Sequence, residues 1–201
     1  MRTPCATAPN HWVAGVADFY QVWANGLVPA IFVIISLFNS DPIIFFSYCA
    51  AVAAATADTW GTEIGVFSKK PPRLITTFKQ VAPGTSGAIS IYGIIAAFSG
   101  SLFIALIGYY SNISYDYSKH SVYAVILVIV SGFLGSIVDS ILGATIQSQY
   151  KCTVCHKITE KNMHCNIETD LVHGSIWMNN DLVNLISISF SGILVYILLN
   201  T

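Results

Sequence analysis

Residues 43–65 read IIFFSYCAAVAAATADTWGTEIG, an alanine-rich apolar run that ends abruptly at Asp58. A run of this kind is typical of a membrane-spanning helix, and the acidic residue marks a return to a polar surface. Residues 58–87 contain two carboxylates, several hydroxyls, a glycine-rich turn and four of the nine basic residues of the chain. This pattern predicts a membrane protein with an anion-binding site at the bilayer surface.

The composition of the whole chain supports a membrane protein. Its 201 residues are 54% hydrophobic and 9% charged, against about 25% charged in soluble domains. The mean hydropathy is +0.65. A soluble fold of this length would bury only about 70% of its unfolded surface and would need a polar exterior that this composition does not supply. The predicted class is therefore all-α, a polytopic helical membrane protein.

Windows of about 20 residues, the length needed to cross the hydrocarbon, predict five transmembrane helices. Residues 1–20 form an N-terminal segment, and residues 21–201 are expected to form a single membrane domain. The first two spans are short and are separated only by Asn39-Ser-Asp-Pro42, which is typical of a helical hairpin. The predicted spans are 22–38, 42–57, 89–110, 122–146 and 182–199.

The basic residues predict the topology. Five spans place the N-terminus and the loops 58–88 and 147–181 on one side of the membrane. Eight of the nine basic residues lie on that side, and only Lys119 lies on the other. The positive-inside rule therefore predicts cytoplasmic basic loops and a C-terminus across the membrane, with the organelle left open. The eight residues are Arg2, Lys69, Lys70, Arg73, Lys79, Lys151, Lys157 and Lys161.

The first of these loops has the residue types that hold a nucleotide. Phosphate binding requires cations, carboxylates for Mg²⁺, and backbone amides exposed by glycines. Asp58 and Glu63 are the candidate Mg²⁺ ligands. An ordinary loop-to-helix turn remains open for the glycines, and topology determinants facing anionic lipid remain open for the cations. The phosphate-binding candidates are Lys69, Lys70, Arg73, Lys79, and Gly84, Thr85 and Gly87 at the positive end of the third span.

Asp139 lies within the predicted fourth span, where an ionised carboxylate costs ~3 kcal/mol or more. It is therefore expected to face a polar cavity, meet Mg²⁺ or pair with a residue of the first loop. A protonated carboxyl bonded to a neighbouring helix is the open alternative. Asp181 and Asn184 are three residues apart and share a helical face, which predicts a common ligand, whereas helix capping is the alternative for Asp181.

The second loop contains Cys152-Thr-Val-Cys155 followed by His164-Cys165. Two cysteines at this spacing, with a third cysteine and a histidine, resemble a small structural zinc site that would stiffen a loop without its own core. The open alternative is a set of reduced thiols that shape the loop. The candidate zinc ligands are Cys152, Cys155, His164 and Cys165.

Several segments, in order and with similar spacing over about residues 18–199, resemble one family. They are Ala57-Asp-Thr-Trp-Gly-Thr-Glu-Ile-Gly65, Pro72-Arg-Leu-Ile-Thr-Thr77, Pro83-Gly-Thr-Ser-Gly87, Asp139-Ser-Ile-Leu-Gly-Ala144, Cys152-x₂-Cys155, and Trp177-Met-Asn-Asn-Asp181 with Asn184. The family consists of integral membrane proteins and includes the plant phytyl-phosphate kinase. The resemblance implies a kinase that converts a polyprenyl monophosphate to the diphosphate. Family members usually have one or two further apolar spans before the segment that resembles residues 18–26, whereas only residues 1–17 precede it here.

The first loop is also similar to that of the CTP-dependent dolichol and phytol kinases, which implies CTP as the donor. The hypothesis is a kinase whose partners are membrane lipid, a prenyl monophosphate and a nucleoside triphosphate, with no nucleic acid and with a homo-oligomer left open. Asp58 and Glu63, with Asp139 or Asp181, would hold Mg²⁺. The four acidic residues are the catalytic candidates. The alternatives are a transporter or scramblase of an anionic lipid and a non-catalytic scaffold. The far side offers little beyond Asp41, Asp116 and Lys119, which favours the kinase.

Overall fold

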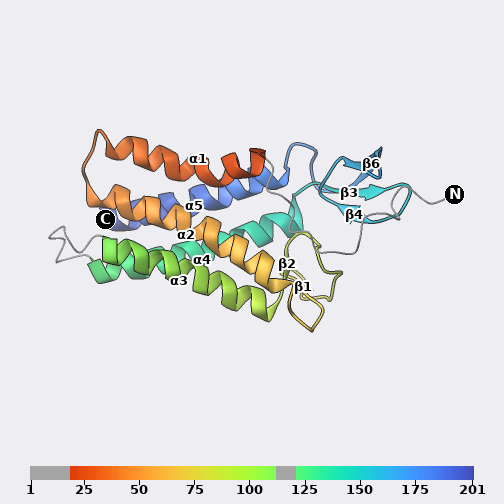
Figure 1. Cartoon of the computed structure of the whole chain (residues 1–201), viewed down its shortest axis with the longest axis horizontal. Helices are drawn as coiled ribbons and strands as arrows, with labels where there is room; N and C mark the ends of the chain where they lie inside the picture. Colours follow the sequence, from red (N-terminus) through yellow and green to blue (C-terminus); the bar gives the residue numbers. More distant parts are fainter. Residues whose placement is uncertain (1–18, 112–120) are drawn as a thin grey trace.

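The computed structural model describes residues 19–111 and 121–201. In this part of the chain, five helices alternate in direction and form an elongated bundle (Figure 1). The predicted N-terminal segment 1–20 lies almost wholly outside the described residues, as do Asp116 and Lys119. The helices are α1 (Phe19–Ser36), α2 (Pro42–Gly65), α3 (Ile91–Ser111), α4 (Ser121–Thr145) and α5 (Asn180–Asn200).

Four of the described helices, α2 to α5, are long and apolar enough to cross a membrane. The helix α1 has a shorter apolar stretch, residues 21–36, and it contacts α2 and α5. It forms the first arm of the predicted hairpin with α2 (Figure 1). Asp41 begins the second arm, because its carboxylate accepts a hydrogen bond from the Ile43 N–H at 2.9 Å. The predicted polytopic helical class is confirmed.

The predicted end of the second span is wrong, because α2 continues past Asp58 to Gly65. The extension is held by close contact with α3. A Cβ atom on Gly93 would lie 2.8 Å from the carbonyl oxygen of Gly61. Small residues allow two membrane helices to approach this closely, and such packing replaces the hydrophobic drive that lipid does not supply. Asp58 therefore lies in a helix rather than at the start of a loop.

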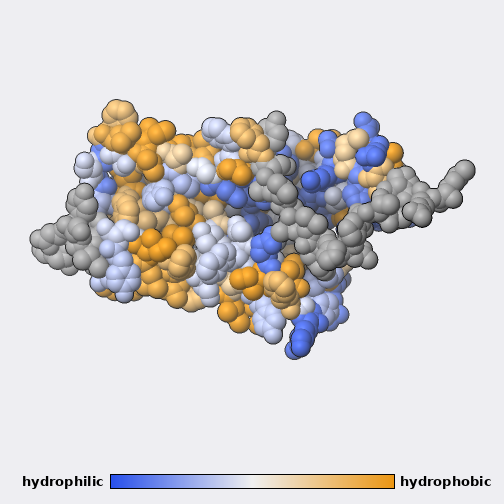
Figure 2. All heavy atoms as spheres, in the orientation of Figure 1, coloured by the Kyte–Doolittle hydropathy of each residue, from blue (hydrophilic) through white to orange (hydrophobic). Residues whose placement is uncertain are grey.

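The helix α2 lies at the centre of the bundle and contacts each of the other four helices. Its alanines are the reason, since Ala50, Ala51, Ala53 and Ala57 are fully buried against the surrounding helices. Many large apolar side chains of the helices are exposed. On the face that Figure 2 shows, apolar residues cover much of the bundle, and hydrophilic residues gather toward the end that carries β3, β4 and β6. An apolar exterior around a small-residue centre is the arrangement expected for a protein whose solvent is lipid.

Short strands, which the sequence did not predict, shape both loops. In the first loop, β1 (Arg73–Leu74) pairs antiparallel with β2 (Ala88–Ile89). The second loop forms a four-stranded sheet in the order β4-β3-β6-β5. Its strands are β3 (Gln149–Cys152), β4 (Ile158–Thr159), β5 (Met163–His164) and β6 (Ile167–His173).

Both loops lie at the same end of the bundle (Figure 1). They also touch, because the Ser86 hydroxyl of the first loop donates a hydrogen bond of 2.7 Å to the Glu160 carboxylate of the second. We call this end the loop end. The sequence prediction that the two loops share one side is confirmed by this contact.

Candidate functional site

Two carboxyl groups meet near the loop end of the bundle. The side chain of Asp58 in α2 lies in hydrogen-bonding contact with that of Asp139 in α4. Asp139 also accepts a hydrogen bond of 3.2 Å from the hydroxyl of Ser187 in α5. Carboxyl groups this close need a shared proton or a cation between them. We call Asp58 and Asp139 the carboxylate pair. Three surroundings were predicted for Asp139: a polar cavity, Mg²⁺, or a partner from the first loop. The structure shows a partner, Asp58, which begins the segment predicted as that loop.

A third acidic residue, Glu160, is close enough to act electrostatically on both members of the carboxylate pair. Glu160 lies in the second loop and is exposed. It was missed by the sequence analysis because an isolated acidic residue in a polar loop has no informative spacing. The contact with Ser86 fixes it at the junction of the two loops.

The oxygens of these three carboxylates suit a hard divalent cation such as Mg²⁺, which prefers carboxylate ligands and the phosphates of a substrate. Three acidic groups from α2, α4 and the second loop give this part of the molecule a concentrated negative charge. A cation would offset that charge. Among the described residues, however, only the cysteine and histidine side chains of the second loop bring three or more ligand atoms within 4.8 Å of one another, so Mg²⁺ at the three carboxylates stays a prediction. The candidate site is therefore a carboxylate centre at the loop end.

Of the other acidic candidates, Glu63 is not brought to the pair. It is exposed and lies five residues beyond Asp58, about 140° around the helix. Asp181 is partly buried in the first turn of α5. The cap of that helix is Asn179, whose side chain accepts a hydrogen bond from the Leu182 N–H at 2.9 Å.

Asn184 is buried one turn further along α5. Its carbonyl oxygen accepts a hydrogen bond of 3.0 Å from the Ser187 hydroxyl. Because the same hydroxyl reaches Asp139, Asn184 lies beside the carboxylate centre. The structure thus brings this predicted residue close to the pair, although a ligand for its amide remains a prediction.

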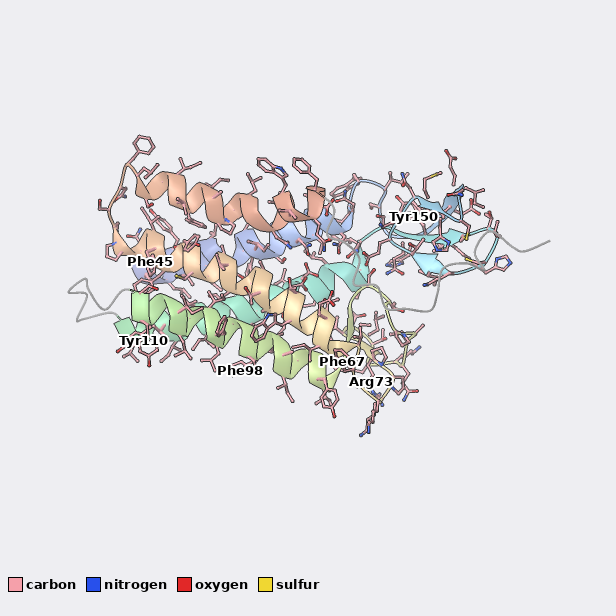
Figure 3. The ribbon with its side chains drawn as sticks, in the orientation of Figure 1. Phe45, Phe67, Arg73, Phe98, Tyr110 and Tyr150 are labelled. Atoms are coloured by element: carbon pink, nitrogen blue, oxygen red, sulfur yellow. The ribbon has the colours of Figure 1, made fainter. Side chains whose placement is uncertain are left out.

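The four basic candidates of the first loop are all exposed. Arg73 lies with Phe67 in the part of this loop that extends from the bundle (Figure 3). Its guanidinium donates a hydrogen bond of 2.8 Å to the carbonyl oxygen of Phe78 and so braces the loop. A role as phosphate clamp stays a prediction for Lys69, Lys70, Arg73 and Lys79.

The glycine turn has a different setting from the one expected. Gly87 has a φ of +73°, and a Cβ on it would clash with the backbone of Ser140 and Ala144 in α4. Gly84 has a φ of +83° but open space around it. The start of α3 is capped by Ser90, whose hydroxyl accepts a hydrogen bond from Gly93 at 3.1 Å. Phosphate binding by Gly84 and Thr85 stays a prediction, and it would use turn amides rather than the helix end.

The four predicted zinc ligands come together in the second loop. The ligand atoms of Cys152, Cys155, His164 and Cys165 all lie within 4.8 Å of one another. The Cys155 N–H donates to the Cys152 sulfur, and this lowers the pKa of Cys152 from its ordinary value to about 7. The cluster can bind a metal such as zinc. Cys165 is disulfide-bonded in this structure, whereas a zinc thiolate requires the reduced side chain.

The fold and the carboxylate centre define the class, a multi-pass helical membrane protein with an acidic site at one end of its bundle. The chain belongs to the family described as integral membrane protein DUF92, whose model matches residues 8–192. This confirms the family resemblance. No solved structure matches the chain.

Three relatives show how far the similarity extends. The chain is 35% identical over 158 residues to the uncharacterized membrane protein MJ0933 of Methanocaldococcus jannaschii, covering 78% of this chain and 59% of the relative. It is 34% identical over 147 residues to protein PGR of Arabidopsis thaliana, covering 71% and 50%. It is 29% identical over 147 residues to protein VTE6, chloroplastic, of the same plant, covering 73% and 34%. The chain thus spans between about a third and three fifths of the length of these relatives.

Proposed function

We propose that the protein is a membrane-embedded kinase that transfers a phosphoryl group from a nucleoside triphosphate to a polyprenyl monophosphate. The observation that carries the proposal is the contact between Asp58 and Asp139, with Glu160 beside them, where both loops meet. The family that the chain resembles includes the plant phytyl-phosphate kinase, which supports this reaction class. CTP is the donor proposed from the similarity of the first loop.

Phosphoryl transfer depends mainly on positioning and on neutralising charge. The carboxylate pair, with Glu160, would hold Mg²⁺, and the ion would neutralise negative charge on the donor phosphates. The cations of the first loop would bind donor and acceptor phosphates from the solvent side. The acceptor is itself an anionic nucleophile, so the chain needs no strong general base.

The helix interfaces constrain where the lipid tail can lie. The interface between α2 and α3 is closed, because Gly61 and Gly93 are in backbone contact. The interface between α2 and α4 is also closed, since a Cβ on Gly132 would meet the Cβ of Ala53 at 2.6 Å. The tail is therefore expected to stay in the bilayer along the apolar outer surface. Its phosphate would approach the carboxylate centre from the membrane side of the loop end.

The hydrogen bonds of two buried serines, Ser101 and Ser191, favour the kinase over a lipid transporter. A transporter needs polar groups that continue through the bundle and face a pathway. Here the Ser101 hydroxyl donates to the carbonyl oxygen of Ile129 at 2.8 Å, and the Ser191 hydroxyl donates to that of Ser131 at 2.8 Å. These bonds join neighbouring helices, as polar side chains do in closed membrane bundles.

The test is incubation of the purified full chain with Mg²⁺, labelled CTP or ATP, and a panel of prenyl monophosphates. We expect a labelled prenyl diphosphate from the wild type and none from Asp58→Asn, because the amide cannot supply the anionic metal ligand. Asp41→Asn is the matched control, since asparagine also caps a helix. It should retain full activity.

Binding provides a second readout. A nucleotide with Mg²⁺ should raise the melting temperature of the wild type in detergent but not that of Asp58→Asn. If Asp58→Asn inserts normally and retains kinase activity, the carboxylate pair is not the site. If no prenyl monophosphate is phosphorylated by the wild type with either nucleotide, the reaction class is wrong.

A further inference from the structure

We propose that Cys152, Cys155, His164 and Cys165 form a structural zinc site that holds Glu160 against the carboxylate centre. Zinc binding and its effect on the loop do not depend on the kinase reaction. Only the effect of Glu160 on catalysis rests on the proposed function. In this proposal the second loop places one acidic side chain beside a site that is otherwise built by helices.

The geometry of the cluster suits tetrahedral zinc. A zinc ion about 2.3 Å from each sulfur requires sulfur–sulfur separations of about 3.8 Å. The sulfurs of Cys155 and Cys165 are 3.8 Å apart. The Nδ1 atom of His164 lies 3.5 Å from the Cys155 sulfur and 3.1 Å from the Cys165 sulfur. Once a thiol reductant has opened the disulfide of Cys165, small shifts of side chains would complete the coordination shell.

The backbone is also arranged as a metal-binding turn. The N–H groups of Val154 and Cys155 both donate to the Cys152 sulfur, so the chain turns tightly around this side chain. His156, directly after the second cysteine, has a φ of +59°. Cys165 has a φ of +54°. Non-glycine residues adopt this left-handed conformation at a cost of about 1 kcal/mol or more each, so the two turns need a stabilising interaction.

A hydrophobic core cannot supply that stabilisation. Among residues 150–173, all of which the structure describes, only Cys152 is buried. A small loop without a core requires a metal or a covalent link to stay folded. This loop offers two such features, the disulfide of Cys165 and the cluster of four ligands, and the zinc measurement below distinguishes them.

The ligands bracket Glu160 in the sequence and in space. Cys155 precedes β4 and His164 ends β5, and Glu160 directly follows β4. The strand β3, which contains Cys152, pairs with β4 through Lys151 and Ile158. Both ends of the segment that carries Glu160 are therefore fixed to the cluster. From there its carboxylate reaches Ser86 at 2.7 Å and acts on the carboxylate pair.

The first experiment measures metal. The full chain is purified under reducing conditions without added chelator, and zinc is measured by elemental analysis. We expect about one zinc per chain, and a loss of most of it in Cys155→Ser. Cys49→Ser is the matched control, because Cys49 lies in α2 outside the cluster, and it should keep its zinc. A zinc-free wild type in which Cys165 stays disulfide-bonded overturns the proposal.

The second experiment measures the loop. Hydrogen exchange is compared before and after zinc is removed with a chelator. We expect faster exchange over residues 157–163, and also over residues 84–87, which touch Glu160 through Ser86. Residues 91–111 of α3 should be unchanged. Unaltered exchange at 157–163 after complete zinc removal overturns the positioning role. This experiment needs no kinase activity, so its failure is distinguishable from failure of the proposed function.

The third experiment links the loop to catalysis. Cys155→Ser should lower turnover about tenfold in the wild type, the size expected when a supporting residue around a site is lost. In a Glu160→Gln background the same substitution should have almost no further effect, because the group that zinc positions is already gone. Equal losses in the two backgrounds would mean that zinc acts on the whole fold and not through Glu160.

Discussion

The two loops at the loop end are held in place by different means. The first, between α2 and α3, rests on the helices: Gly87 lies against the last turns of α4, and the Ser90 hydroxyl donates to the carbonyl oxygen of Gly65 at 3.2 Å. The second, between α4 and α5, folds as a four-stranded sheet and gathers sulfur and imidazole groups within 4.8 Å of one another. Neither depends on a hydrophobic core of its own.

The difference shows how a small membrane protein can build a polar site. A loop that packs its backbone onto helix ends needs glycine and small residues, whereas a loop that extends beyond them needs a local crosslink or metal. The two loops meet at Ser86 and Glu160. Their junction lies over Asp58 and Asp139, so each loop bears on the same acidic centre.

The largest effect is expected on turnover, and it tests whether both loops serve the carboxylate centre. Asp139→Asn removes one carboxylate of the pair, and we expect turnover to fall about 100- to 1,000-fold, the loss typical for one preorganised electrostatic group. Prenyl-phosphate kinase assays on detergent-purified protein would measure it. A normal elution volume in size-exclusion chromatography is the control for folding, and wild-type turnover would show that the loops serve another site.

The next effect tests how the first loop is anchored. Gly87→Ala and Gly84→Ala both place alanine at a positive φ, which costs about 1–2 kcal/mol. Gly87→Ala also drives a methyl group into α4, and overpacking adds about 1–3 kcal/mol. Thermal unfolding in detergent should therefore show a clearly larger loss for Gly87→Ala. Equal losses would mean that the turn does not rest on the helix.

A smaller effect is expected on the KM for nucleotide, and it distinguishes the basic residues of the first loop from those of the second. Lys79→Gln in the first loop should raise the KM for nucleotide about tenfold, since a hydrogen bond to a charged group contributes about 1.5 kcal/mol. Lys161→Gln in the second loop is the matched control and should leave the KM within about twofold, because an isolated exposed charge contributes little. Steady-state kinetics at varied nucleotide concentration would measure the KM of both variants. Similar changes in both variants would indicate a general electrostatic field.

The smallest effect concerns support of the carboxylate pair by α5. Ser187→Ala removes the hydrogen bond to Asp139 and should lower turnover about fivefold, equivalent to about 1 kcal/mol. Ser189→Ala is the control, because its hydroxyl donates to Leu185 within the same helix. Turnover of both variants is compared with that of the wild type. A loss in Ser189→Ala as large as in Ser187→Ala would point to helix stability rather than to the contact with Asp139.

Much of the architecture could be predicted from the sequence. Apolar windows located the helices because a segment that crosses lipid must be long and apolar and must form all its backbone hydrogen bonds internally. Asp139 was recognised as unusual because an ionised group within a span is costly, and the spacing of Cys152 and Cys155 indicated the ligand cluster. The pairing of Asp58 with Asp139 could not be predicted, since 81 positions separate them and no local pattern joins α2 to α4.

Glu160 and the true end of α2 escaped prediction for related reasons. In the sequence, an exposed glutamate cannot be distinguished from other surface charges. Only the folded position of its loop brings it close to the carboxylate pair. The extension of α2 to Gly65 depends on contact with Gly93, and helix propensity disfavours glycine at Gly61 and Gly65. Contacts between distant segments override local preference at both places.

By itself the sequence determined the membrane class, the places of the helices in the described part of the chain, the shared side of the two loops and the gathering of cysteine and histidine side chains in the second loop. These follow from local chemistry: apolar length, the bias of charge between loops, and cysteine spacing. The tertiary structure decided which carboxylates meet, which glycines serve packing and which loop residue completes the acidic centre. Helix packing brings together groups that are far apart along the chain, and their distances depend on every interface between them.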